Sequence, residues 1–179
     1  MMKSTKVSLF ASLLVLTVTP TVAQSGYQTV TVNDGGTITG TVKWNGPVPK
    51  MPTVAINKDV EVCDPQAQKK RDLERLVIGD SGGVANTVVF LKDITKGKAM
   101  DLPEGRQFLN QKTCRYEPHV LLVPDNGTLQ LKSSDPVLHT VHMSGASDYN
   151  LPFPFANQTI TRTMNRSGVV DVRCNASHT

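Results

Sequence analysis

The sequence has no strong excess of charge of either sign. Its 19 Lys and Arg residues stand against 15 Asp and Glu residues, and the basic residues are scattered; the one cluster, at 69–71, lies beside Asp72 and Glu74. Nucleic-acid binding needs clustered basic charge, so we expect no nucleic-acid partner. No apolar run reaches the ~20 residues that a transmembrane helix needs, so we expect no membrane span.

The familiar catalytic motifs are also missing. The sequence contains no HExxH zinc motif and no phosphate-cradling glycine loop. The segment GDSGG at 79–83 looks like the nucleophile segment of chymotrypsin-like proteases, but that arrangement needs a histidine earlier in the chain, and His119 is the first one here. We therefore interpret GDSGG as a turn and expect the protein not to be an enzyme.

The first 23 residues are typical of a secretory signal peptide. Lys3 and Lys6 precede an apolar run at 7–18, and small residues lead to a cleavage position after Ala23. Without this segment the chain has 17 basic and 15 acidic groups, and its length suits one domain, residues 24–179. We expect a protein of the bacterial periplasm or a secreted one, and a truncated C-terminus is one alternative that the sequence leaves open.

Most apolar stretches are short, rich in β-branched residues and bounded by Gly, Pro, Asn or Asp. This pattern predicts an all-β fold, an antiparallel β-sandwich, with a single short helix at 65–75 and an ordered loop at 144–158. The predicted strands are 28–32, 37–43, 54–56, 76–78, 85–91, 119–123, 128–131, 140–143, 158–164 and 169–174.

Three cysteines leave one over if two pair. Cys63 and Cys114 lie far apart in turn-rich segments, which would suit a disulfide that closes a long loop in an oxidising compartment. Cys174 differs because it ends a predicted strand. Side chains alternate along a strand, and the polar pair Asp171 and Arg173 marks the outer face, so the Cys174 thiol should point inward.

Two explanations of Cys174 remain open at this point. A buried cysteine often acts only as a small apolar side chain. However, His178 follows four residues later, and a thiolate and an imidazole that converge can bind a soft or borderline metal ion. A metal site would need a third ligand from elsewhere in the chain.

The segments YEPHVLLVPDNGTLQL and SDPVLHTV, followed later by RSGVVDVRC and His178, resemble the cupredoxin, or blue copper, family. The resemblance covers about 115–179, and the upstream segments GGTITGTVKWNGPVP and GGVANTVVFL are similar, more loosely, to the extra N-terminal strands of plastocyanin-like and methylamine-utilisation-like periplasmic proteins. It implies a Greek-key β-sandwich with one type 1 copper ion bound by His139, Cys174 and His178. It also implies electron transfer to a redox partner protein.

Strand parity supports the choice of His139 independently. If Val141 faces the core, His139 and Met143 share its face, while Thr140 and His142 take the other. His142 is then an outward-facing side chain, or an alternative ligand if a bulge shifts the register. We expect His119 to be structural.

The family usually supplies an axial methionine after the second histidine, and that position would lie beyond Thr179. Met143 is a poor substitute. Two other functions remain open: copper storage or delivery through the same ligands, and a metal-free binding module, because GTITGTV is similar to carboxypeptidase regulatory-like and transthyretin-like domains.

Overall fold

The computed structural model describes residues 27–100 and 107–176, so the predicted signal peptide and His178 lie outside the described residues. The described chain is nearly all β, as the sequence predicted, and none of its helices is long and apolar enough to cross a membrane. The elements are β1 (Gln28–Thr29), β2 (Thr53–Ala55), α1 (Val60–Cys63), β3 (Lys70–Asp72), β4 (Lys96–Gly97), β5 (Phe108–Lys112), β6 (Arg115–Glu117), β7 (Gly127–Ser133), β8 (His139–Gly145), β9 (Tyr149–Phe153), β10 (Thr159–Met164) and β11 (Val170–Arg173).

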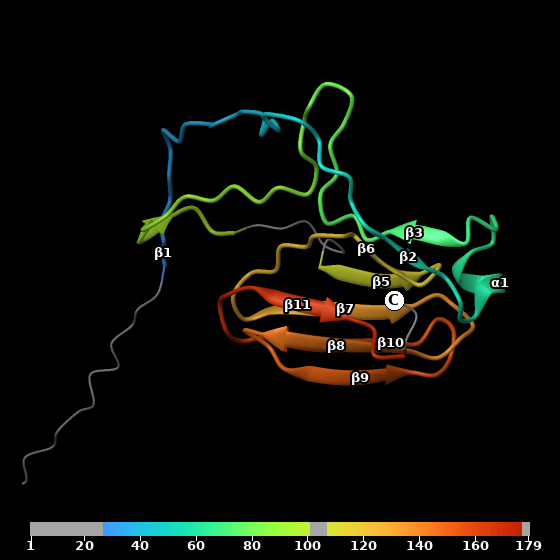
Figure 1. The fold of residues 1–179 in the computed structure, drawn as a ribbon. Coiled ribbons are helices and arrows are strands. Elements are labelled where there is room, and N and C mark those ends of the chain that lie inside the picture. Colours follow the sequence, from blue (N-terminus) through green and yellow to red (C-terminus); the bar gives the residue numbers. More distant parts are fainter. Residues whose placement is uncertain (1–26, 101–106, 177–179) are drawn as a thin grey trace, which may run out of the picture.

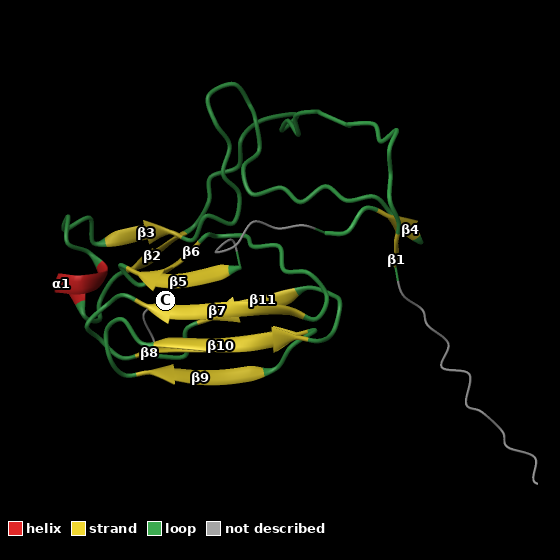
Figure 2. Ribbon diagram, turned by 180° about the vertical axis from the view of Figure 1, so that it is seen from behind, coloured by secondary structure: helices red, strands yellow, loops and turns green. Residues whose placement is uncertain are grey.

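The strands from β5 onward form two sheets that lie together in Figures 1 and 2. One sheet has the order β10-β7-β5-β6 and the other β11-β8-β9. The chain passes from β7 in the first sheet to β8 and β9 in the second, returns to β10, and ends with β11 in the second. The expected antiparallel pairing holds for most of these strands, but β5 and β7 run parallel.

The core lies between the two sheets, because each contributes its inward-facing side chains to one buried cluster. The cluster contains Leu109, Leu129, Leu131, Val141, Met143, Phe153 and Met164. Alternation is clear along β7 and β8, where every second side chain is buried. Leu131, Met143 and Phe153 are fully enclosed. This packing fixes the register of β8, the strand on which the candidate site depends.

The N-terminal half departs most from the predicted strands. Of the predicted strands 37–43, 76–78 and 85–91, the structure retains only isolated bridges, Lys43 with Gly83 and Ile78 with Val84. Figure 1 shows the chain before β2 and after β3 extending away from the two sheets as long loops. Ile38 and Val89 are 84% and 78% exposed. Strand propensity alone does not form a sheet without a surface to pack on.

Two other predicted elements are corrected. The segment 119–123 is not a strand: prolines at 118 and 124 flank it, although Leu121 and Val123 still pack against the core. The loop expected at 144–158 contains strand β9, which pairs with β8.

The predicted helix at 65–75 is also wrong. Ala67, Lys69 and Glu74 have positive φ angles, which break a right-handed helix. The Asp64 carboxylate accepts hydrogen bonds from the N–H groups of Gln68 and Lys69, a side-chain interaction that competes with helix formation. The segment therefore forms a turn that leads into β3.

A disulfide between Cys63 and Cys114 joins this region to the first sheet, as the sequence had suggested. It closes a loop with a sequence separation of 51, which in a chain-entropy treatment stabilises the fold by about 4 kcal/mol. The buried Arg71 guanidinium supports the same junction: it donates hydrogen bonds to the carbonyl oxygens of Cys63 at 2.5 Å, Cys114 at 2.7 Å and Thr113 at 3.3 Å.

Candidate metal site

His139, the first residue of β8, lies on the core side of its strand. The side chains of His139, Val141 and Met143 are buried, whereas those of Thr140 and His142 are only partly so. His139 has no exposed surface. The parity of this strand, predicted from Val141 alone, is therefore confirmed. An imidazole in this position must satisfy both ring nitrogens inside the protein.

Cys174 reaches the same place from the neighbouring strand. In the pairing of β11 with β8, Val172 lies opposite Met143 and Arg173 opposite His142, so the next residue, Cys174, arrives beside the beginning of β8. Val172 packs against the core while Arg173 is exposed, which agrees with the inward direction predicted for the thiol. The sulfur of Cys174 lies 3.6 Å from Nδ1 of His139.

That separation fits two ligands of one ion. With bond lengths of about 2.0–2.1 Å to imidazole nitrogen and about 2.3 Å to thiolate, and an angle of about 110–120° between them, the two donor atoms lie about 3.5–3.8 Å apart. The distance between Nδ1 of His139 and Sγ of Cys174 falls within this range. The two side chains can thus bind a metal ion together without a change of the backbone.

Thr140 contacts the sulfur from the other side. Its backbone N–H points at Sγ of Cys174 at 3.5 Å, and its hydroxyl oxygen lies 3.9 Å from the same atom. The hydroxyl oxygen also accepts a hydrogen bond from the backbone N–H of Asn175 at 2.6 Å. These contacts tie the end of β11 to the beginning of β8, and donors directed at sulfur are among the features that tune a thiolate site.

Asp135 holds the other side of the imidazole. Its Oδ2 lies 2.9 Å from Nε2 of His139, and both side chains are buried. Two backbone N–H groups fix the carboxylate in turn: that of Thr113 donates to Oδ1 at 2.7 Å and that of Cys114 to Oδ2 at 2.8 Å. A histidine that binds metal through one nitrogen commonly gives the other N–H to a carboxylate in this way.

The electrostatics of the site follow from burial and from these contacts. Burial alone lowers the pKa of His139, but the hydrogen bonds to Cys174 and Asp135 outweigh it and raise the pKa above its ordinary value. Tyr116 lies nearby, and burial, reinforced by the charge of Cys174, raises the pKa of its hydroxyl. The Tyr116 hydroxyl shares its one hydrogen between the carbonyl oxygens of Thr140 at 2.6 Å and Arg173 at 3.0 Å, residues adjacent to the two candidate ligands.

The remaining histidines lie elsewhere or outside the described residues. His142 takes the opposite face of β8 from His139, with Arg173 and Asn150 as its strand neighbours, and no bulge alters its register. His119 lies 3.6 Å from a carboxylate oxygen of Glu74, which suits the structural role expected for it. His178 follows the last described residue, Ala176, by two positions.

Met143 is too far away to be an axial ligand. It lies four residues from His139 on the same strand, a separation of about 13 Å at the usual rise per residue. The structure instead encloses Met143 in the core. Met143 is thus a poor axial candidate, as expected from the sequence.

Donor atoms of Cys114, Asp135 and His139 also lie within 4.8 Å of one another. However, the Cys114 sulfur is bonded to that of Cys63, so it offers no thiolate to a metal. We therefore interpret Cys114 and Asp135 as residues that hold the imidazole through its Nε2 atom. The candidate site lies at the other ring nitrogen, Nδ1, beside the Cys174 sulfur.

Sequence reasoning missed the three residues that hold the two candidate ligands. Asp135, Thr140 and Tyr116 lie within the segments YEPHVLLVPDNGTLQL and SDPVLHTV, but the sequence assigned none of them a role at the site. Asp135 was visible only as part of the polar loop before His139, and a four-residue separation does not show that a carboxylate turns back on an imidazole. Tyr116 contacts the site from another sheet, which only the fold brings close.

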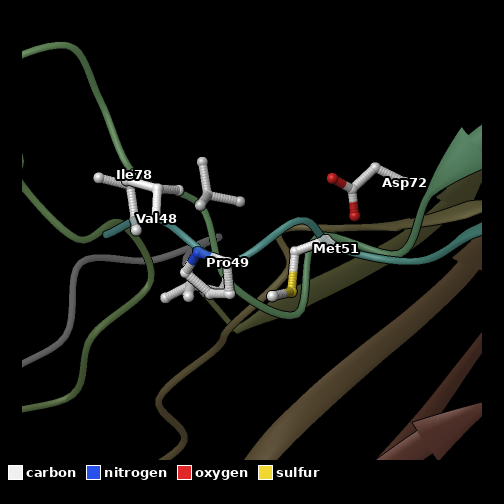
Figure 3. A pocket seen from close by; sticks show the side chains of 7 residues that line it. Val48, Pro49, Met51, Asp72 and Ile78 are labelled. Atoms are coloured by element: carbon white, nitrogen blue, oxygen red, sulfur yellow. The ribbon is translucent and has the colours of Figure 1, made fainter. Parts of the chain in front are cut away.

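A shallow hollow on the surface offers a less suitable place for chemistry (Figure 3). Its lining is mostly aliphatic, with Met51 at one side and Asp72 as the one charged side chain. The Asp72 carboxylate already accepts a hydrogen bond from the backbone N–H of Glu74. One carboxylate among apolar groups does not form a metal-binding set.

Comparisons with known proteins found no matching family model, no matching curated protein and no matching solved structure.

Proposed function

We propose that this chain is an exported copper protein of the type 1 class that carries single electrons, with His139, Cys174 and His178 as ligands. The observation that carries the proposal is the distance of 3.6 Å between Nδ1 of His139 and the Cys174 sulfur, at the end of two paired strands. Imidazole and thiolate together favour copper, because thiolate stabilises Cu(I) and imidazole accepts both oxidation states. The signal-peptide pattern of residues 1–23 supports export.

We propose His178 as the third ligand because it is close enough to Cys174 in the sequence for its imidazole to reach the same ion. The backbone carbonyl of Ala176 accepts a hydrogen bond from Nζ of Lys58 at 2.5 Å, and Ala176 itself is nearly buried. Two residues of extended chain span about 7 Å, which is enough to return an imidazole toward Cys174. The pairing of Thr140 with Asn175 holds the same segment close to β8.

The residues around the site suit electron transfer better than substrate chemistry. With one thiolate and two imidazoles, the proposed ligand set would hold a copper ion suited to one-electron exchange, with few other demands on the protein. His139 is fixed by Asp135, and Cys174 is held through Thr140, so the two ligands have little freedom to rearrange. Ligands that stay in place keep the reorganisation on electron transfer small.

The fold we propose for residues 107–176 is a Greek-key β-sandwich of the cupredoxin kind. Two sheets share one core, and between β7 and β11 the chain crosses from one sheet to the other three times. This connectivity supports the proposal, as does the position of both candidate ligands at the same end of β8 and β11. In the first sheet, the two central strands, β5 and β7, pair in parallel.

Addition of Cu(II) to the purified protein tests the site. We expect an intense visible thiolate-to-copper charge-transfer band, which the Cys174→Ser variant loses and which His139→Ala and His178→Ala abolish or shift strongly. His142→Ala is the matched control, because His142 lies on the other face of the same strand, and it should leave the band unchanged. A wild-type protein without the band would refute the proposal and leave the metal-free module as the better interpretation.

Voltammetry separates electron transfer from copper storage or delivery. A carrier cycles reversibly between its two copper states and retains the ion, measured as an unchanged copper content after many cycles. Loss of copper on each reduction, or transfer of Cu(I) to a soluble chelator within seconds, would favour storage or delivery through the same ligands.

A further inference from the structure

A continuous path of contacts joins the disulfide to the candidate copper site. The Cys114 backbone N–H donates to Oδ2 of Asp135, the same oxygen lies against Nε2 of His139, and Nδ1 of His139 faces the Cys174 sulfur. Every group in this path except the sulfur of Cys174 is buried. Neither Cys114 nor Asp135 belongs to the proposed ligand set.

The carboxylate determines which ring nitrogen carries the proton. An ionised carboxylate only accepts hydrogen bonds, and Oδ1 and Oδ2 of Asp135 already face two backbone donors. Nε2 of His139 must therefore carry hydrogen toward Asp135. In the neutral imidazole, Nδ1 then presents a lone pair on the side of Cys174, which is the form that binds a metal.

The loop that supplies the two donors has an uncommon backbone. Thr113 and Cys114 have φ angles of 51° and 57°, in the left-handed region that few residues other than glycine adopt. Two constraints act on this loop: the disulfide from Cys114 to Cys63, and the hydrogen bonds from Arg71 to the carbonyl groups of the same residues. They keep two consecutive N–H groups directed at one carboxylate.

We propose that Asp135 is the positioning residue of the copper site, and that the Cys63–Cys114 disulfide supports the site through it without contributing a ligand. The expected effect of Asp135 on copper binding rests on the proposed copper function. Its structural part, the proton on Nε2 of His139, can be tested without metal. The two can therefore fail separately.

The first measurement uses the metal-free wild-type protein, isotopically labelled and kept free of oxygen and of thiol reductants. Long-range nitrogen-to-proton NMR correlations, recorded above the pH at which the His139 ring titrates, report which nitrogen is protonated. We expect the proton on Nε2. A proton on Nδ1 would overturn the proposal whatever the behaviour of any variant.

The second measurement compares Asp135→Asn with the wild type. The asparagine amide has one oxygen and one NH2 group, so it cannot accept from both Thr113 and Cys114, and at least one of the three donors loses its partner. We expect a mixture of the two His139 tautomers and a copper affinity weaker by about 10- to 100-fold, the usual effect of removing such a partner. The copper band should also shift. Asp148→Asn, a change of an exposed carboxylate, is the control and should match the wild type.

The third measurement removes both sulfur atoms of the disulfide with Cys63→Ser and Cys114→Ser together. We expect the same changes in His139 tautomer and copper band as in Asp135→Asn, but smaller, because Arg71 still restrains the loop. Circular dichroism and the core methyl resonances confirm that each variant is folded. Folded variants with a wild-type tautomer, affinity and band would overturn the proposal. A wild-type protein without a copper band would instead refute the proposed function, while the tautomer result stands.

Discussion

Removal of one hydroxyl group, in Tyr116→Phe, tests how the two sheets are joined beside the candidate site. Tyr116 belongs to β6 in the first sheet, and its hydroxyl bonds the carbonyl oxygens of Thr140, in β8, and Arg173, at the end of β11. Both partners therefore lie in the second sheet. The substitution keeps the ring and its packing and deletes only these contacts.

At neutral pH we expect the variant to be less stable by about 1–2 kcal/mol. A typical hydrogen bond contributes about 0.5–1.5 kcal/mol, and here one hydroxyl serves two carbonyl oxygens. The ring stays in contact with the core, so no cavity forms and the loss should not exceed this range.

At alkaline pH the difference should become smaller. Burial and the Cys174 charge raise the pKa of Tyr116 above its ordinary value of 10.0, so the folded protein keeps a proton that the unfolded chain releases. Stability from this group is therefore complete below pH 10 and decreases as the pH rises above it, by at most about 1.4 kcal/mol per pH unit. Phenylalanine has no proton to release. Between pH 8 and pH 11 the wild type should lose about 1 kcal/mol more than Tyr116→Phe.

Urea unfolding at pH 8 and pH 11, with the disulfide intact, gives both free energies. Tyr27→Phe is the control: Tyr27 is 50% exposed, and its hydroxyl donates to the Lys98 carbonyl, so we expect a change below about 0.5 kcal/mol at either pH. If the difference between wild type and Tyr116→Phe is the same at both pH values, or larger at pH 11, the reasoning about this buried hydroxyl is wrong.

Three further predictions concern stability and are measured by the same unfolding experiment. Leu131→Ala empties a fully buried position between the sheets and should cost about 3–5 kcal/mol, whereas a cost below 1 kcal/mol would mean that the two sheets do not share this core. Gly145→Ala places a Cβ against the carbonyl oxygen of Val169 at a φ of +110°, so it should cost more than about 2 kcal/mol, and a neutral result would contradict the close pairing of β8 with β11. Arg71→Met keeps an unbranched apolar stem but removes the donors to three carbonyl groups; a loss of more than about 2 kcal/mol is expected, and an unchanged unfolding midpoint would refute the role of this residue.

The sequence predicted β7, β8, β10 and β11, but β9 was expected as a loop and β5 and β6 were not predicted. Along β7 and β8 every second side chain enters a shared core, so a period of two identifies these strands and their inner faces. The N-terminal half carries the same β-branched composition in 37–43 and 85–91. Those segments contribute no buried side chain to the core, and propensity without burial predicted strands that the structure lacks.

The candidate site likewise has residues that the sequence identifies and residues that it does not. Parity along β8 identified the inward direction of His139 and parity along β11 that of Cys174, since such information is local. The supports of the imidazole are not local: Asp135 depends on backbone donors at Thr113 and Cys114, in a loop whose conformation no motif predicts. The sequence can therefore name the proposed ligands and cannot name the residues that orient them.

The identity of the group facing Nδ1 is what distinguishes a metal ligand from an ordinary buried histidine. A fully buried imidazole needs a partner for each nitrogen, and an oxygen atom is the stronger hydrogen-bonding partner. Asp135 provides such an oxygen for Nε2, yet Nδ1 faces the sulfur of Cys174, and a thiol is a weak donor and a weak acceptor. A sulfur atom is a weak hydrogen-bonding partner for a histidine with a purely structural role. It is, however, a ligand that copper favours, and a copper ion bound to Nδ1 could bind it as well.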